Sequence, residues 1–331
     1  MMYFCTLFDI HYINKGLALY ASLENCTSDF ELLIMAMDRP CQESLEKCSL
    51  SHARIECIED IMSVELVTAK SNRNRAEFCW TCGSYITDYF LNKYDLPELV
   101  YLDSDLMFFS SPQIVFDELH HKNASVGLTP HFTPTSIFGK YCVQFVYFKN
   151  DTNGVSALRW WKDACLTWCY SNLENGKFGD QKYLDYFAER FDHVCEIENR
   201  GVGIAYWNMA QYRYQDGMVI YQDRQWPIVF FHYSGINISL IEETLILRHN
   251  MFLPQKIRHT FVEPYAHLLK SVSERYLNTK VSSILIEPLS KKGYPIKRIL
   301  AYLNRILPID WVVAQVMRIK HTQRTSLYSD K

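Results

Sequence analysis

Along the first two-thirds of the chain, short apolar runs alternate with longer stretches of helical periodicity. Strands are predicted where apolar residues run continuously or alternate, and helices where they recur at the spacing of one helical face. The predicted strands are residues 3–9, 30–37, 54–58, 99–109, 125–129, 143–149 and 228–233. The predicted helices are residues 15–24, 58–70, 76–93, 112–120, 154–173 and 180–191. This alternation predicts an α/β fold with a largely parallel sheet flanked by helices.

Beyond about residue 238 the pattern becomes helical and more basic, so we expect a main domain over residues 1–238 and a helical extension over 239–331. Residues 291–331 carry nine Lys or Arg and two Asp, whereas the whole chain has a net charge of −3. Basic residues flank apolar positions at helical spacing, so segment 291–324 is predicted to bind an anionic membrane surface. Packing of these faces on the main domain is an equally good interpretation.

The composition narrows the class of protein. With 331 residues, 48% hydrophobic and 21% charged, the chain can bury a core and is not expected to be disordered. Lys+Arg 34 against Asp+Glu 37 argues against a nucleic-acid partner. No apolar run is long enough to cross a bilayer, and the N-terminus lacks the basic start of a signal peptide. Eleven irregularly spaced cysteines fit reduced thiols, so a cytoplasmic protein is expected.

The strongest chemical signal is a pair of acids inside an apolar segment, Leu-Val-Tyr-Leu-Asp-Ser-Asp-Leu-Met-Phe-Phe at 99–109. Burying Asp103 and Asp105 is costly unless something compensates their charge. A divalent cation is the natural compensation, because carboxylate oxygens suit Mg²⁺ or Mn²⁺ and substrate phosphates commonly complete the shell. A solvated turn would be the alternative for an isolated Asp-x-Asp, but the apolar context on both sides favours metal.

Two further segments carry candidate residues. The strand 228–233 delivers His232 to a turn at Gly235, where an imidazole could bind metal and backbone amides could reach a phosphate. Asp180 and Gln181 open a predicted helix, and from the local pattern alone Asp180 is interpreted as its N-cap.

Together these motifs resemble nucleotide-sugar glycosyltransferases of the GT-A fold, nearest in layout to the retaining family of glycogenin and the bacterial lipooligosaccharide galactosyltransferases. A closer resemblance is to bacterial transferases of cell-surface polysaccharide or lipopolysaccharide biosynthesis. The shared segments, spanning residues 3–235, are Arg-Ala-Glu-Phe-Cys-Trp-Thr (75–81), Tyr-Leu-Asp-x-Asp (101–105), Leu-Thr-Pro-His (128–131), Trp-Trp (160–161), Phe-Gly-Asp-Gln-Lys-Tyr-Leu-Asp (178–185) and Gly-x-Gly-x-Ala-x-Trp-Asn (201–208).

The resemblance implies a metal-dependent transferase that moves a sugar from a UDP-sugar to a surface glycan or lipid-linked glycan. Asp103, Asp105 and His232 would bind the Mn²⁺ or Mg²⁺ that bridges the donor phosphates. The residues expected to bind the donor are Thr6, Phe8, Asp9, Lys15, Arg75, Ser104 and Gly235. For Arg75, an exposed surface charge is an equally good interpretation.

The matched Asp-Gln pair implies that Asp180 holds sugar hydroxyls and that Gln181 faces the anomeric carbon. An amide is a poor nucleophile but can stabilise an oxocarbenium-like centre, so retention of configuration is expected. An inverting enzyme with Asp180 as general base is the alternative.

The segment 141–145 departs from the resemblance, because relatives usually show Tyr-Asn-x-Gly-Phe where this chain has Cys142 and Gln144. This puts acceptor choice, and activity itself, in question. Trp207, Asn208 and His131 are candidate acceptor-side residues. A nucleotidyltransferase and an inactive sugar-nucleotide-binding protein remain alternatives, and the basic C-terminal segment suggests peripheral attachment to the inner face of the cytoplasmic membrane.

Overall fold

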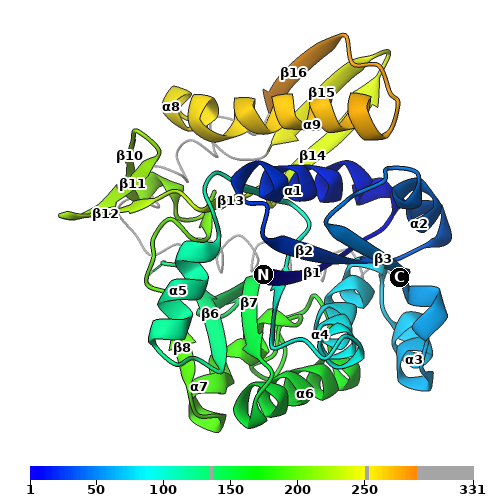
Figure 1. Cartoon of the computed structure of the whole chain (residues 1–331), viewed down its shortest axis with the longest axis vertical. Helices are drawn as coiled ribbons and strands as arrows, with labels where there is room; N and C mark the ends of the chain where they lie inside the picture. Colours follow the sequence, from blue (N-terminus) through cyan, green and yellow to red (C-terminus); the bar gives the residue numbers. More distant parts are fainter. Residues whose placement is uncertain (134–136, 250–252, 289–331) are drawn as a thin grey trace, which may run out of the picture.

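The computed structural model describes residues 1–133, 137–249 and 253–288, and its centre is a seven-stranded sheet of order β3-β2-β1-β4-β7-β6-β8 (Figure 1). The strands are β1 (Met2–Phe8), β2 (Phe30–Ala36), β3 (Ala53–Cys57), β4 (Glu98–Leu102), β6 (Val126–Pro130), β7 (Tyr141–Lys149) and β8 (Val194–Glu196). β1, β2, β3 and β4 are parallel, whereas β7 runs antiparallel to both β4 and β6. The α/β class is confirmed, with a mixed sheet.

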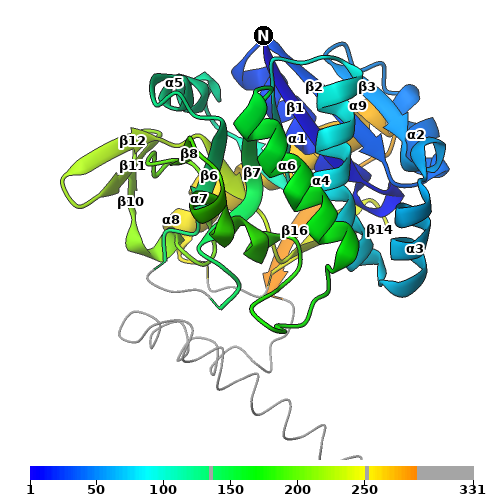
Figure 2. The same cartoon turned by 90° about the horizontal axis from the view of Figure 1, so that it is seen from below.

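Helices cover both faces of this sheet. α1 (Ile13–Cys26), α5 (Gln113–His121) and α9 (Glu263–Tyr276) pack into one core, and α3 (Val64–Asn72), α4 (Arg75–Lys93) and α6 (Thr152–Thr167) into the other. α4 and α6 lie side by side (Figure 2). The other helical elements are α2 (Arg39–Glu46), α7 (Phe187–Arg190), α8 (Gln255–Ile257), the 3₁₀ helices η1 (Ile10–Tyr12), η2 (Ile58–Ile61), η3 (Gln181–Tyr186) and η4 (Met209–Gln211), and the π-helical η5 (Arg258–Val262).

β1 shows why the strands look continuously apolar in sequence. Phe4 and Phe8 belong to the core under α1, while Cys5 and Leu7 belong to the core under α4. Successive side chains of a strand point to opposite faces, so a strand covered on both faces is apolar throughout. The carboxyl ends of the parallel neighbours β1 and β4 therefore meet at one edge of the sheet, where open α/β sheets bind ligands.

The single strand predicted over 99–109 is two strands. β4 ends at Leu102, and β5 (Leu106–Phe108) belongs to a separate sheet of order β5-β13-β9. Its partners are β13 (Phe230–His232) and β9 (Ile204–Ala205). The break places both acids in a turn, where carboxylates cost less free energy than in the buried middle of a strand.

Two predicted helices are also interrupted or shortened. In the segment 58–70, Ser63 accepts a hydrogen bond from the backbone of Leu66, so a new helix, α3, starts after η2. α6 ends at Thr167 because the backbone of Trp168 is extended. In contrast, α4 begins as predicted, with a capping box between Asn74 and Glu77.

The described residues beyond 238 correct the prediction of a purely helical extension. β14 (Ile236–Ile241), β15 (Thr244–His249) and β16 (Ser283–Pro288) form a sheet, and only residues 255–276 are helical. The apolar runs here are short and rich in Ile and Leu, which fits strands as well as helix faces. A further small sheet contains β10 (Arg213–Gln215), β11 (Met218–Tyr221) and β12 (Arg224–Pro227).

The structure bears on the predicted domain boundary at residue 238 but not on the chain beyond residue 288. α9 packs into the same core as α1, so residues on both sides of the proposed boundary at 238 share one interior (Figure 1). The predicted membrane-binding segment 291–324 lies outside the described residues. Within the described part of the chain, no helix combines the length and apolarity needed to span a bilayer.

Candidate active site

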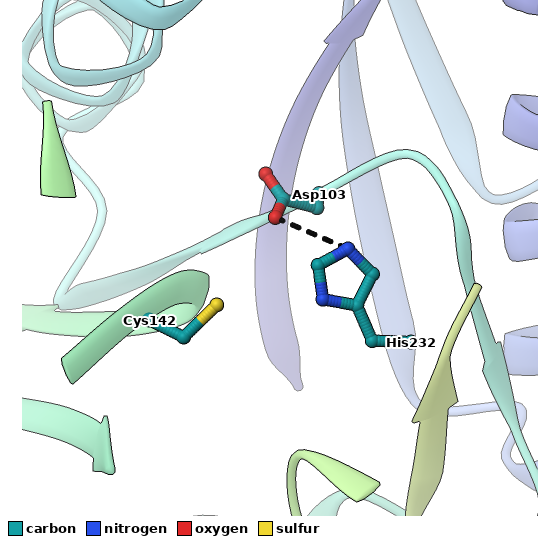
Figure 3. Close-up of side chains that lie close together, drawn as sticks. All are labelled: Asp103, Cys142 and His232. Carbon is teal, nitrogen blue, oxygen red and sulfur yellow. Dashed lines mark ion pairs between the residues drawn. The ribbon is translucent and has the colours of Figure 1, made fainter. Parts of the chain in front are cut away.

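Three residues singled out from the sequence come together where β4, β5 and β13 meet. The backbone N–H of Asp103 donates to the carbonyl of Gln144 at 3.1 Å, which fixes the start of the turn after β4. The antiparallel pairing of β13 with β5 places His232 opposite Leu106, beside that turn. His232 Nε2 lies 3.0 Å from a carboxylate oxygen of Asp105 and 3.6 Å from one of Asp103 (Figure 3 shows Asp103 and His232).

This cluster is largely removed from solvent and carries charges that shift each pKa. The exposed fractions of the side chains are 23% for Asp103, 15% for Asp105 and 7% for His232. Burial raises the pKa of Asp103 to about 7, although His232 opposes the shift. Burial also acts on Asp105, but the charges of His232 and Lys15 outweigh it and lower its pKa. Burial lowers the pKa of His232, but Asp105 outweighs this effect and raises it well above its usual value.

The donor set fits a divalent cation. Two carboxylates and one imidazole converge, and they suit Mn²⁺ or Mg²⁺ when further oxygens from a substrate complete the shell. His232 Nδ1 is buried without a hydrogen-bond partner, so one nitrogen of the ring makes no hydrogen bond within the protein. The Lys15 ammonium group lies 3.5 Å from a carboxylate oxygen of Asp105 and forms an ion pair with it.

Cys142 lies beside this cluster. From the sequence, Cys142 stands out only because similar proteins usually have Asn at this position. Ligand atoms of Asp103, Cys142 and His232 all lie within 4.8 Å of one another. Burial would raise the pKa of the Cys142 thiol, but His131 and His232 lower it to about 6. The predicted strand started at residue 143, whereas β7 starts at Tyr141, and this earlier start brings Cys142 into the sheet beside the site.

Asp180 and Gln181 lie at the start of η3, and the expected N-cap is not formed. Asp180 is buried, and its side chain makes no capping hydrogen bond. Burial, reinforced by the charge of Asp103, raises the pKa of Asp180 well above its usual value. The Asp180 carbonyl accepts a hydrogen bond from the indole of Trp161 at 2.9 Å. The Gln181 amide donates to the carbonyl of Phe138 at 3.0 Å.

The residues expected to bind the donor are distributed along the carboxyl edge. Thr6, Phe8 and Asp9 are buried at the end of β1, and the Thr6 hydroxyl has no hydrogen-bond partner. The guanidinium of Arg75 forms an ion pair with Asp9, and the Arg75 side chain is 57% exposed.

Two positions follow directly on the strands that build the cluster. Ser104 lies between the two acids, in the turn between β4 and β5. Gly235, just after β13, has a φ of 80°, a conformation that favours glycine.

An aromatic group borders the cluster on the side predicted to face the acceptor. The Trp207 ring lies 5.4 Å from the His232 ring and 5.3 Å from the His131 ring, centroid to centroid. Asn208 is buried and bonds to the backbone of Ala205, Gly203 and His131, so its role within the protein is to fix this segment. Tyr206 packs edge-to-face against Trp207 and is 46% exposed, and it was missed because it occupies a variable position of the segment 201–208.

The chain is similar in sequence to proteins of Bacillus subtilis strain 168. No protein-family model matches the chain. The uncharacterized protein YfnF of Bacillus subtilis strain 168 is 32% identical over 255 residues, which are 72% of this chain and 83% of YfnF. YfnD of the same strain is 28% identical over 252 residues, which are 73% of this chain and 80% of YfnD.

Solved structures show the same architecture. The galactosyltransferase LgtC, solved with donor and acceptor sugar analogues, matches with a TM-score of 0.52 and 12% identity over 82% of this chain and 96% of LgtC. The glycosyltransferase GlyE of Streptococcus pneumoniae TIGR4 matches with a TM-score of 0.50 and 15% identity over 83% of this chain and 63% of GlyE. The chain therefore has the GT-A fold of glycosyltransferases. Within that class, it belongs to the same family as YfnF.

Proposed function

We propose that the protein is a metal-dependent glycosyltransferase that transfers a sugar from a UDP-sugar to a bacterial glycan. The observation that carries the proposal is the convergence of Asp103, Asp105 and His232 at the carboxyl edge of β4 in a GT-A fold. Such an edge is where open α/β sheets bind ligands, and its acids and imidazole form a donor set for a divalent cation.

Asp103, Asp105 and His232 would hold Mn²⁺ or Mg²⁺, which when bound neutralises charge on a leaving diphosphate. The protein orients these ligands before any substrate arrives. Backbone hydrogen bonds fix both ends of the turn, from Asp103 N–H to the Gln144 carbonyl and from Tyr233 N–H to the Asp105 carbonyl. These bonds use backbone groups alone, so neither carboxylate is needed to hold the turn in place.

The end of β1 would hold the nucleotide. Thr6 and Phe8 lie on β1, the strand next to β4, and Asp9 follows its end, so a nucleotide placed there would reach the acid pair with its phosphates. Ser104 and Gly235 would supply backbone groups to the diphosphate, because turns with exposed N–H groups bind anions. Arg75 would act by fixing Asp9 through their ion pair, and Lys15 by balancing the charge of Asp105.

Asp180 and Gln181 would hold the donor sugar. Transfer breaks the bond between the anomeric carbon and the diphosphate oxygen and forms a bond from that carbon to the acceptor oxygen. The acceptor's proton leaves with the diphosphate. The Gln181 amide would stabilise positive charge at the anomeric carbon, and attack from the leaving-group side gives retention.

The acceptor would enter past the rings of Tyr206 and Trp207, since aromatic faces stack on sugar rings and Tyr206 is exposed. A glycan linked to a lipid would also explain the basic segment 291–324, which would hold the enzyme against an anionic membrane.

Release of UDP from UDP-sugars tests the activity and its metal dependence. With Mn²⁺ present, we expect slow hydrolysis of at least one UDP-sugar and faster UDP release when a glycan acceptor is added. EDTA should abolish the release and excess Mn²⁺ should restore it, because the carboxylates cannot replace a cation at the diphosphate. Binding of UDP-sugars without turnover in a panel of donors would instead favour a sugar-nucleotide-binding protein.

The anomeric configuration of the product tests the role of Gln181. We expect an α-linked donor sugar to give an α-linked product, measured by proton NMR during the reaction. A β-linked product would show inversion and would assign Asp180 as the general base. Release of pyrophosphate from a nucleoside triphosphate, with no transfer from UDP-sugars, would identify a nucleotidyltransferase.

A further inference from the structure

Cys142 places a sulfur atom within the candidate metal centre. It lies on β7, it is 3% exposed, and its sulfur is within 4.8 Å of ligand atoms of Asp103 and His232 (Figure 3). A carboxylate oxygen, an imidazole nitrogen and a sulfur atom at such separations can close on one cation. A set of this kind favours thiophilic ions such as Zn²⁺ or Cd²⁺ over Mg²⁺.

The second observation is the orientation of the His232 ring. Nε2 faces the two carboxylates, at 3.0 Å from Asp105 and 3.6 Å from Asp103. Nδ1 has no hydrogen-bond partner although the residue is only 6% exposed, and it lies on the side of the ring that faces Cys142 (Figure 3). A buried nitrogen without a partner is costly for the fold, and a bound ion would satisfy it.

We propose that Cys142, His232 Nδ1 and Asp103 form a site for a thiophilic divalent cation, and that this site competes with the one proposed for Mn²⁺ or Mg²⁺. Binding there releases to solvent the proton of His232 Nδ1 and any proton that remains on the Cys142 thiol, since the ligands are a neutral imidazole and a thiolate. Both positions use Asp103, and a neutral imidazole offers a lone pair at only one nitrogen at a time. One cation therefore excludes the other.

The consequence for activity rests on the proposed function. A zinc ion at Cys142 takes Asp103 and His232 away from the position that serves the donor diphosphate, so Zn²⁺ inhibits transfer. Replacing Cys142 by Ser or Asn should remove this inhibition by Zn²⁺, since only a thiolate supplies the soft ligand.

Absorption of bound Co²⁺ tests the sulfur ligand without using activity. Co²⁺ alone, added to the full chain under reducing conditions, should give a thiolate-to-metal charge-transfer band in the near ultraviolet. The band should be absent in Cys142→Ser and in Cys142→Asn. Cys26→Ser is the matched control, because Cys26 is a partly buried thiol at the end of α1, and it should keep the band.

Zinc binding tests the same site in the wild-type protein and in the Cys142→Ser variant. X-ray absorption of the zinc-loaded wild type should show one sulfur neighbour at about 2.3 Å. Zn²⁺ affinity should fall by at least about 10–100-fold in Cys142→Ser, since losing a direct ligand costs no less than losing an outer-shell partner. Zn²⁺ should also displace bound Mn²⁺ from the wild type, measured by electron paramagnetic resonance of the released Mn²⁺.

The outcomes separate this inference from the proposed function. A missing sulfur neighbour, or a Co²⁺ band that persists in both Cys142 variants, overturns the thiophilic site. If the thiophilic site is overturned but the protein binds Mn²⁺ and releases UDP, the transferase proposal is retained without it. A sulfur-ligated cation in a protein that releases no UDP supports the site and counts against the transferase.

Discussion

Replacing Asp105 by Asn is expected to reduce metal-dependent UDP release by at least about 10²–10³-fold, the loss typical of removing one electrostatic group from an active site. Asp105 is the acid nearest to His232, at 3.0 Å, and it also pairs with Lys15 at 3.5 Å. The amide keeps the shape of the side chain but removes the charge that binds a cation. The measurement is UDP release at saturating donor over a range of Mn²⁺ concentrations.

Asp117→Asn is the matched control for this prediction. Asp117 is exposed on α5, and its replacement also removes one negative charge. Circular dichroism of both variants checks that the fold is retained, since Asp105→Asn leaves Lys15 without its ionic partner. Equal activity of the two variants would remove the acid pair from the proposed mechanism.

Replacing Trp161 by Ala is expected to lower the free energy of unfolding by about 3–5 kcal/mol, as for other buried aromatic residues. Trp161 is fully buried on α6, where its ring stacks on Phe148 at 5.9 Å between centroids. The change also leaves the carbonyl of Asp180 without the indole donor. We therefore expect lower activity as well as lower stability, with urea unfolding followed by circular dichroism as the measurement.

Two other variants show which part of this loss comes from packing. Trp161→Phe keeps a ring but not the N–H, so it should cost about 1–3 kcal/mol for the unpaired carbonyl together with a small cavity. Trp160→Ala alters the neighbouring, partly exposed tryptophan and should cost less than Trp161→Ala. A Trp161→Ala protein as stable as Trp160→Ala would contradict the assignment of Trp161 to the core.

Much of the central sheet could be predicted because its strands are covered on both faces. β1, β2 and β7 are apolar over nearly their whole length, so their positions follow from the sequence alone. The antiparallel direction of β7 could not be predicted, since a buried strand has the same pattern in either direction. The strands beyond residue 235 were missed because β14 and β15 are short and joined by Glu242-Glu243, which resembles a helical surface.

The site was predictable to the extent that its residues lie at strand ends. Asp103, Asp105 and His232 each follow or end an apolar run, and the fold brings them together. Cys142 lies inside such a run, where a cysteine normally serves as a small apolar residue. Its place beside His232 depends on the pairing of β7 with β4 and of β13 with β5, which no local pattern contains.

The break between β4 and β5 means that the acid pair lies where two sheets adjoin. Asp103 continues from the large sheet, whereas His232 belongs to the small one. A ligand bound by both side chains therefore bridges two sheets that are not hydrogen-bonded to each other through their strands. Binding should stabilise the packing of one sheet against the other.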